Sequence, residues 1–563
     1  MKKYRWQLTI LFITGLVVGA LLFFERRGGL GEVSAPKPVE GGVYTEALIG
    51  NIQRLNPLLD DNNSVDRDID SLIYSGLVKF DSQGYPQNDL AESIGISQDG
   101  ILYNIVLRKD LKWHDGEPLT SADVLFTIEL MRAGTGYIPD DVIALWKEIN
   151  VQAFDDLNLQ IKLPESFAPF LDYLAFGVLP RHIYGQMDLA QIVSSSLNLQ
   201  PVGSGPYQFS ELLTDNGTIT GIKLSAFPGY YGQKPFLQEI IFELYQEAES
   251  AYQAYKDGYV QGIAEIPSNL LPDALGNTDL SIYTGRLPRI SLVMLNVNDP
   301  EALFLQDVDV RKALLLAIDR SGLIAEVFNG QAVIADSVIL PETWAYNNSI
   351  PRFTYDPEQA KLLLKQAGYV VTGELNPVRK KDDDELKIVL TYPEDALHEK
   401  IAKSIASDWA KVQVEVVLDP VPGDLIVDEK LNPRAFQAAL VDINLSQTPD
   451  PDPYPFWDMG QASNGQNYTQ WSNRTASDTL EQARVTTDLS ERIRLYHNFQ
   501  VIFANDLPAL PLYYPVYNYA VDAGIQGVTM GPLFDTSDRF ATITQWYLTA
   551  RRESGATDAP EGN

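Results

Sequence analysis

Residues 448–457, with the sequence TPDPDPYPFW, alternate four prolines with two carboxylates and three aromatic residues. Proline fixes φ and pushes the residue before it toward extended geometry, so Asp450 and Asp452 should be held stiffly on a loop. A stiff loop loses little entropy when a ligand arrives. A carboxylate beside Tyr454 and Trp457 suits an ammonium group or a stacked aromatic group. A ligand-binding loop and a rigid structural turn are equal alternatives on this chemistry.

Residue patterns that would indicate catalysis or a metal are missing from the sequence. There is no phosphate-binding G-x-x-x-x-G-K-[ST] and no H-E-x-x-H. Gly203-Ser204-Gly205 fails as a nucleophile elbow because Val202 stands where the first glycine is required. The four histidines lie far apart, and the chain has no cysteine for a disulfide, a thiolate nucleophile or a thiolate metal site. We therefore expect a protein that is not an enzyme, with no catalytic residue, no metal and no cofactor.

Asp66, Asp68 and Asp70 imitate the start of a calcium loop. Ser71 stands at the position of the turn glycine, and Leu77 replaces the bidentate glutamate. The pattern is therefore interpreted as a solvated helix face.

The first 27 residues predict a membrane anchor. Residues 6–24 are uncharged, with basic residues on both sides, and 19 helical residues span roughly 28 Å, about one bilayer core. No small-x-small site follows closely, which favours an uncleaved single-pass helix over a cleaved signal peptide. The chain has no cysteine, which excludes a lipid anchor. We expect the main body to lie outside the cytoplasm, in the periplasm or at the cell surface, with a cleaved, secreted form as the alternative.

The rest of the chain is long and acidic. The net charge is −32, although the first 27 residues hold five basic residues and one acidic residue. Such a field repels nucleic acid and anionic lipid. A body of this length exceeds one hydrophobic core, so two or three domains are expected.

Helical and strand-like segments alternate irregularly, which indicates α/β domains. Residues 356–367 predict a helix capped by Asp356 and ended by Gly368. Further helices are expected at 309–328, after Thr120 and after Ser490. Strands are expected at 290–296, 386–392, 412–418 and 438–442.

Five segments, in order, carry a family resemblance. They are residues 72–81 (LIYSGLVKFD), 111–124 (LKWHDGEPLTSADV), 201–209 (PVGSGPYQF), 310–320 (VRKALLLAIDR) and 355–369 (YDPEQAKLLLKQAGY). Together with the Asp-Pro-Asp loop, they make residues 42–547 resemble the family 5 extracellular solute-binding proteins, the dipeptide and oligopeptide receptors of ABC importers. In this family the segment around Trp113 and His114 is scaffold and not a site.

The resemblance implies an α/β, two-lobed periplasmic-binding-protein fold (type II-like) with an additional subdomain, preceded by one transmembrane helix. The implied units are an anchor at 1–27, a flexible linker at 28–42, lobe I at 43–80, 200–285 and 506–549, the extra subdomain at 81–199, lobe II at 286–505 and a disordered tail at 550–563.

The resemblance also implies a ligand site between the lobes. An aspartate close to the Asp-Pro-Asp loop holds the amino terminus of a peptide in related receptors, but here Gln447 stands three residues before Asp450. The anchor is then Asp442, Asp450 or Asp452, or it is missing. Asp450 is the preferred charge partner, with Tyr454, Trp457 and Trp471 as walls and Asn467 as a hydrogen-bonding partner.

The implied function is capture of a peptide and its delivery to the permease subunits of an ABC transporter, by a protein expected to be monomeric. Two alternatives stay open. One is a non-peptide solute such as an oligosaccharide, a nickel chelate, haem or an opine. The other is a surface sensor or adhesion module that works without an importer.

Overall fold

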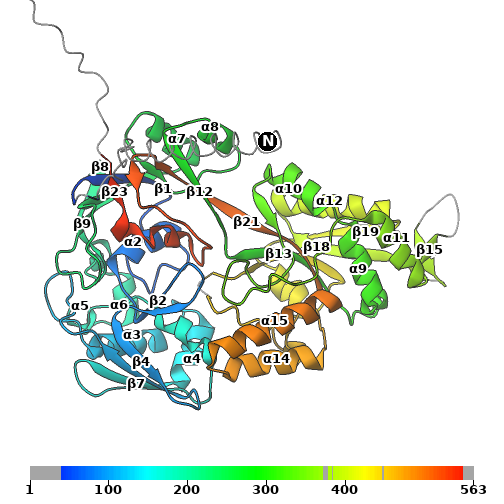
Figure 1. Cartoon of the computed structure of the whole chain (residues 1–563), viewed down its shortest axis with the longest axis horizontal. Helices are drawn as coiled ribbons and strands as arrows, with labels where there is room; N and C mark the ends of the chain where they lie inside the picture. Colours follow the sequence, from blue (N-terminus) through cyan, green and yellow to red (C-terminus); the bar gives the residue numbers. More distant parts are fainter. Residues whose placement is uncertain (1–37, 39, 372–377, 383, 447–448, 550–563) are drawn as a thin grey trace, which may run out of the picture.

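The computed structural model describes residues 38–549, apart from residues 39, 372–377, 383 and 447–448. The expected anchor and tail lie outside this part of the chain, as do most of the linker and Gln447. Among the described residues, no helix combines the length and apolarity needed to cross a membrane. Figure 1 shows two bodies joined by the long strand β21 (Ala509–Asp522).

A 12-stranded mixed sheet runs through both bodies. In pairing order its strands are β19 (Glu415–Val421), β18 (Lys387–Pro393), β20 (Ala438–Asn444), β13 (Arg289–Leu295), β21, β11 (Gly262–Ile263), β1 (Val43–Ile49), β10 (Glu239–Tyr245), β9 (Thr218–Ala226) and β8 (Tyr207–Asp215), with β12 (Leu280–Arg286) and β14 (Ala332–Ile334) also paired to β21.

Strand β21 belongs to both lobes. Its first half pairs with β13 and β14, where Ser291 lies opposite Tyr513. Its second half pairs with β12 and β11, where Ile263 lies opposite Ala520. The backbone hydrogen bonds of one strand therefore tie the two lobes together.

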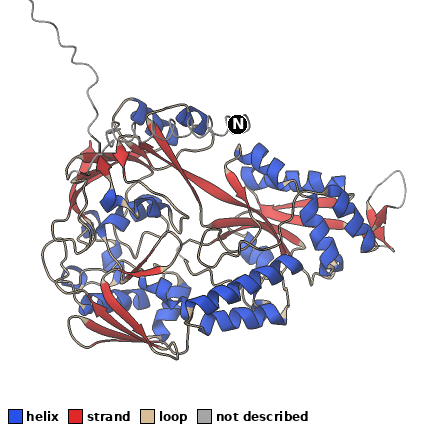
Figure 2. Cartoon of the chain, viewed as in Figure 1, coloured by secondary structure: helices blue, strands red, loops and turns tan. Residues whose placement is uncertain are grey.

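Lobe II buries both faces of its part of the sheet, as Figure 2 shows by the helices on either side of the strands. On one face Val293 and Leu440 pack in a cluster with helices α9 (Val308–Ala317), α10 (Arg320–Phe328), α11 (Pro357–Gln366) and α12 (Ala396–Lys411). On the other face Leu292 and Val441 pack with α14 (Arg474–Val485) and α15 (Leu489–Asp506). Successive strand residues point to opposite faces, which explains the near-continuous apolar strands.

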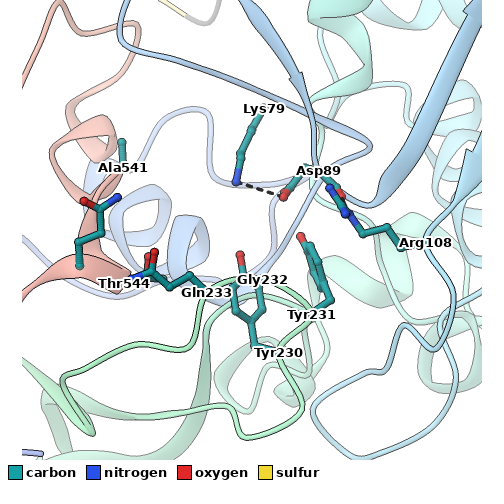
Figure 3. Close-up of a pocket in the computed structure, with 10 residues that line it drawn as sticks. Lys79, Asp89, Arg108, Tyr230, Tyr231, Gly232, Gln233, Ala541 and Thr544 are labelled. Carbon is teal, nitrogen blue, oxygen red and sulfur yellow. Dashed lines mark hydrogen bonds and ion pairs between the residues drawn. The ribbon is translucent and has the colours of Figure 1, made fainter. Parts of the chain in front are cut away.

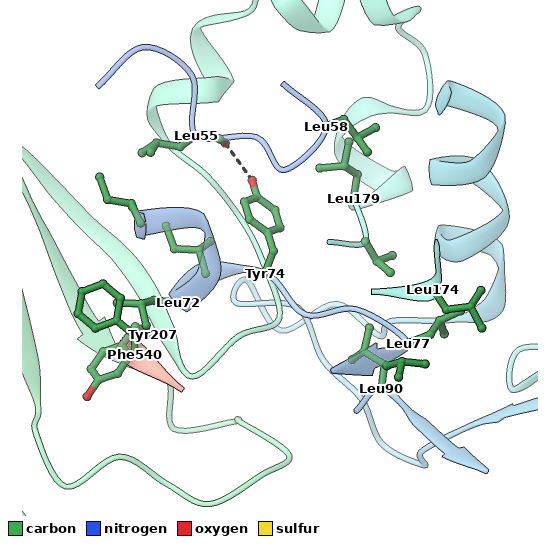
Figure 4. Close-up of a cluster of buried hydrophobic side chains, with 14 of the residues drawn as sticks. Leu55, Leu58, Leu72, Tyr74, Leu77, Leu90, Leu174, Leu179, Tyr207 and Phe540 are labelled. Atoms are coloured by element: carbon green, nitrogen blue, oxygen red, sulfur yellow. Dashed lines mark hydrogen bonds between the residues drawn. The ribbon is translucent and has the colours of Figure 1, made fainter. Parts of the chain in front are cut away.

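Lobe I and the extra subdomain share one hydrophobic cluster. In lobe I it includes residues of helix α2 (Ser64–Ile73), whereas α7 (Ala248–Lys256) and α8 (Leu271–Leu275) pack in a smaller cluster. The subdomain contains a four-stranded antiparallel sheet, β4 (Ala91–Ile96), β5 (Leu102–Leu107), β7 (Asn158–Lys162) and β6 (Asn150–Ala153), with α3 (Ser121–Ala133), α4 (Asp140–Glu148), the 3₁₀ helix η1 (Ala168–Leu174), α5 (Arg181–Tyr184) and α6 (Leu189–Val193). Figure 4 shows part of this core, where the Tyr74 hydroxyl donates to the Leu55 carbonyl over 3.2 Å.

The described chain also contains smaller elements. They include the pairs β2 (Val78–Phe80) with β3 (Pro86–Asn88) and β22 (Ile525–Gln526) with β23 (Tyr547–Leu548), the ribbon β15 (Val370–Val371), β16 (Arg379–Lys381) and β17 (Asp384–Glu385), and the short helix α13 (Tyr454–Trp457).

The Gly203-Ser204-Gly205 turn packs against the segment that contains His114. The Gly203 amide donates to Nδ1 of His114 over 3.1 Å, and Nε2 of the same ring lies 3.1 Å from the Gly205 carbonyl. Burial lowers the pKa of His114 to about 4, which keeps the ring neutral. A Cβ on Gly203 would lie 1.9 Å from the Ile73 carbonyl oxygen, so only glycine fits. Both segments act as scaffold.

The helix predictions are confirmed at 356–367 and after Thr120. Asp356 accepts a hydrogen bond from the Gln359 amide over 2.9 Å, and Asp123 accepts one from the Thr120 amide over 2.8 Å. The single helix predicted at 309–328 is wrong. It breaks into α9 and α10, because Ile318 is extended and the Asp319 carboxylate caps the second helix. The cap predicted at Ser490 is also wrong, since Asp488 caps α15.

Candidate functional site

Strands β18 and β20 are parallel, so their carboxyl ends meet at one edge of the lobe II sheet. Ligands of open α/β sheets bind outside such carboxyl ends. Asp442 lies near the end of β20 and pairs in register with Ser291 of β13. His398 lies in the first turn of α12, just after β18. Three polar side chains that are distant in sequence therefore gather at this edge.

Asp442 and its neighbours have unsatisfied hydrogen-bonding capacity. Oδ1 of Asp442, Oγ of Ser291 and Nε2 of His398 are buried, and none has a hydrogen-bond partner among the described residues. The other carboxylate oxygen of Asp442 lies 3.8 Å from His398 Nε2 and 3.9 Å from Arg289 Nε. A buried polar group without a partner costs roughly 1–3 kcal/mol. A ligand donor placed here would recover that cost.

The charge of His398 depends on two carboxylates. Burial lowers the pKa of His398, but Asp442 and Asp395 together outweigh it and raise the pKa above its usual value. Asp395, the N-cap of α12, lies 2.6 Å from His398 Nδ1. The imidazolium is thereby favoured, and it partly offsets the negative charge of this edge.

Lobe I contributes Glu265 to the same junction. Glu265 follows β11 and is exposed. Desolvation by the surrounding protein raises the pKa of Glu265, while the positive charges of Arg289 and Arg539 lower it. Arg289, which lies 3.9 Å from Asp442, thus also acts electrostatically on a carboxylate of lobe I.

Asp450, the preferred charge partner from sequence, is buried and already paired. Its side chain is 6% exposed and forms an ion pair with Arg492. The Tyr496 hydroxyl donates to Asp450 Oδ1 over 3.0 Å. The Asp450 amide donates to Asp172 Oδ2 over 2.9 Å, and Asp172 belongs to the subdomain helix η1. This environment favours the rigid structural turn over a free ligand anchor.

Asp452 and Tyr454 share Arg484 of α14. Arg484 lies 3.0 Å from Asp452 Oδ2, and its guanidinium stands 4.3 Å from the centre of the Tyr454 ring. Burial raises the pKa of Asp452 to about 6, against the opposing effect of Arg484. Asp452 has φ of +24°, which reflects how tightly the loop turns.

The two tryptophans and the asparagine expected at the site are core residues. Trp457 is 2% exposed and packs edge-on against Phe503, with 4.8 Å between ring centres. Trp471 is buried and its indole nitrogen donates to Asp506. The Asn467 amide donates to the carbonyls of Asp458 and Trp471. These side chains satisfy one another inside lobe II.

A separate polar pocket of about 260 Å³ lies between lobe I and residues 81–199 (Figure 3). Its residues include Lys79, Asp89, Arg108, Tyr230 and Tyr231. Lys79 lies 3.4 Å from Asp89, and Arg108 stands over the Tyr231 ring and donates to the Asp89 carbonyl. The charges of this pocket are thus largely engaged with one another.

The expectation of a solvated face at Asp66, Asp68 and Asp70 is wrong, because all three are buried. Asp66 accepts from the Gln53 and Arg54 amides, and Asp68 forms an ion pair with Arg539 over 2.6 Å. Both oxygens of Asp70 are buried without a hydrogen-bond partner. No group of three or more histidine or acidic side chains within the described ranges is arranged to hold a metal ion.

Four residues of the candidate site, His398, Ser291, Arg289 and Glu265, are not among those expected from the sequence. The four histidines lie far apart in sequence, so spacing alone does not single out His398. Its position after Asp395, at the junction of a predicted strand and a helix, was the available signal. Ser291 and Glu265 carry no local signal, because strand pairing alone brings them to the junction.

The fold is that of a two-lobed α/β binding protein whose candidate site lies where the lobes join. The chain belongs to the bacterial extracellular solute-binding proteins of family 5, whose "family 5 Middle" model matches residues 85–466.

Known proteins resemble this chain over most of its length. It is 26% identical over 555 residues to the oligopeptide-binding protein AppA of Bacillus subtilis, covering 97% of this chain and 99% of AppA. It is 28% identical over 465 residues to the dipeptide-binding protein of Escherichia coli, covering 79% of this chain and 84% of that protein.

Solved structures share the fold. AppA of Bacillus subtilis in complex with a nonapeptide gives a TM-score of 0.65 at 26% identity, covering 91% of this chain and 100% of that chain. HbpA2 of Haemophilus parasuis gives a TM-score of 0.79 at 22% identity, covering 90% of this chain and 100% of that chain.

Proposed function

We propose that this protein captures peptides between its two lobes and delivers them to the permease subunits of an ABC transporter. The observation that carries the proposal is the unpaired, buried Oδ1 of Asp442 at the carboxyl edge of β20. A carboxylate oxygen held out of water and without a donor suits the ammonium group of a peptide. The similarity to AppA over 97% of the chain, and to the dipeptide-binding protein over 79% of it, supports a peptide as the solute.

Asp442 is the proposed amine anchor, and Ser291 and His398 are the polar groups beside it. Asp450 and Asp452 are engaged by arginines, and Gln447 lies outside the described residues. Oδ1 of Asp452 is also buried without a partner in the described part of the chain, but its Oδ2 is paired with Arg484 at 3.0 Å. The cationic side chains beside Asp442 lie farther away, at 3.8 and 3.9 Å, so Asp442 is the less engaged of the two.

The direct test is native mass spectrometry of residues 28–563 as purified, followed by denaturing mass spectrometry of any released solute. A ladder of peptide masses supports the proposal. A single discrete non-peptide mass, such as that of a haem or a metal chelate, contradicts the peptide assignment and leaves solute binding in place.

We further propose that residues 1–27 hold the protein to the membrane with the lobes outside the cytoplasm. The uncharged run 6–24 and its basic flanks support this. Membrane fractionation and the intact mass of the mature protein test it. A soluble protein that has lost the first 27 residues would contradict the anchor and show that the segment is a cleaved signal.

A further inference from the structure

The subdomain and lobe II touch along a seam that lies away from the strands crossing between the lobes. The seam is formed by Ser166, Phe167 and Asp172 on one side and by Asp450, Arg484 and Val485 on the other. Figure 1 shows helix α14 beside the subdomain, while β21 passes between the lobes on the opposite side. Phe167 packs with the cluster of lobe I and the subdomain, whereas Tyr454, which lies beside Arg484, packs with the cluster of lobe II.

Polar contacts hold the seam. The Asp450 amide donates to Asp172 Oδ2 over 2.9 Å, and the Ser166 hydroxyl donates to the Val485 carbonyl over 3.0 Å. Arg484 reaches both sides, because it pairs with Asp452 of its own lobe and stands 5.0 Å from the centre of the Phe167 ring of the subdomain. No covalent connection passes through the seam, so each contact exists only while the two bodies lie together.

The contact between Asp172 and Asp450 is unusual, because it brings two carboxyl groups together. Burial and then the Asp450 carboxylate raise the pKa of Asp172 well above its usual range, against the opposing influence of Arg492, while Asp452 adds to the rise. A like charge beside a buried acid disfavours its ionisation. The seam therefore tolerates a neutral acceptor at position 172 better than a carboxylate.

We propose that this seam is a closing contact in which Asp172 and Arg484 act as positioning residues that hold lobe II against the subdomain. The inference rests on the proposed capture of ligand between the lobes, since closure is how such proteins retain a solute. It also gives the Asp-Pro-Asp loop a role, because Asp450 presents its amide to the subdomain while Arg492 and Tyr496 fix its side chain.

The chain has no cysteine, so paired spin labels can be placed without a background. We choose Lys162→Cys on β7 of the subdomain and Gln482→Cys on α14 of lobe II, both exposed. The label-to-label distance is measured by double electron–electron resonance on protein freed of co-purified solute, so the result does not depend on the identity of the solute. Four variants are compared with the labelled parent: Arg484→Ala, Asp172→Ala, Asp172→Asn and the control Arg474→Ala, which removes an exposed arginine from the same helix.

We expect Arg484→Ala and Asp172→Ala to gain a population at longer distance. Asp172→Asn, which keeps the acceptor oxygen and removes the charge, should stay at the parental distance, as should Arg474→Ala. Distributions for Arg484→Ala and Asp172→Ala that coincide with the Arg474→Ala control would overturn the proposal. Arg484 is partly exposed, so its variant gives the answer even where Asp172→Ala does not fold. Peptide capture would survive such a result, because native mass spectrometry tests it separately.

Discussion

Asp450 and Arg492 form an ion pair inside lobe II in which each side chain is only 6% exposed. Removing one partner of a buried pair leaves an uncompensated charge and costs about 3–5 kcal/mol. We expect Asp450→Ala to lower the free energy of unfolding by that amount in denaturant titrations. Asp478→Ala, which removes an exposed partner of Arg474, is the control and should change stability by less than about 1 kcal/mol. If Asp450→Ala left stability unchanged but abolished peptide binding, the loop would instead be assigned to the ligand site.

Asp442→Asn tests the proposed amine anchor. Asparagine keeps the shape and removes the charge, so a free-amine peptide recovered from the purified protein should bind more weakly. A hydrogen bond to a charged group contributes roughly 1.5–3 kcal/mol, which corresponds to about a 10- to 100-fold loss. Calorimetry with the N-acetylated form of the same peptide should show little difference between the two proteins. Equal losses for both forms would argue against a charge contact, and Asp424→Asn, an exposed change after β19, is the control.

Asp60 and Asp70 predict an unusual dependence of stability on pH. Both side chains are buried, and burial followed by the Asp61 carboxylate raises the pKa of Asp60 to about 8. The folded state therefore binds this proton more tightly than the unfolded chain does, whose aspartates titrate near 3.9. The stabilisation is fully present below about pH 4 and is lost as pH rises through about 8.

Thermal unfolding between pH 4 and pH 9 measures this effect. Asp60→Asn removes the titrating group, so its stability should depend less on pH and exceed that of the parent above pH 8. Parallel pH profiles for the two proteins would show that Asp60 titrates normally.

Gly203→Ala tests the scaffold turn. The added methyl group would lie 1.9 Å from a backbone carbonyl of α2, which cannot move aside cheaply. Overpacking of this kind typically costs at least about 1–3 kcal/mol. We expect a lower unfolding midpoint in denaturant, while Gly423→Ala, whose nearest neighbour would be 3.9 Å away, should be nearly neutral. Equal midpoints for both variants would mean that the turn relaxes.

Local signals predicted local structure well. The Asp356 cap and the Thr120–Asp123 pair are physical features of a few adjacent residues, and both form hydrogen bonds in the structure. The break between α9 and α10 was missed because its cause is partly tertiary. The Asp319 amide donates to Asp408 of a different helix over 2.8 Å. No pattern within residues 309–328 predicts that contact.

The candidate site was only partly predictable. Asp442 was among the expected anchors, but Trp457, Trp471 and Asn467 proved to be interior residues, because aromatic and amide side chains are as common in cores as in binding sites. Asp66, Asp68 and Asp70 looked solvated since charged triplets usually are. Asp68 is buried against Arg539, which lies far along the chain, and Asp66 accepts from the amides of Gln53 and Arg54.

Strand β21 has a consequence for the order in which the protein assembles. Within the described residues, strands β12 and β14 pair only with residues 509–522, and β11 and β13 gain their second neighbour there, near the end of the described chain. Such distant pairings slow folding, because loop closure must precede the contacts that stabilise it. A nascent chain that has not yet reached residue 509 exposes unpaired strand edges in both lobes, the feature through which folding intermediates aggregate. Chaperone protection during synthesis should therefore matter more for this protein than for a protein in which each lobe is built from one continuous segment of chain.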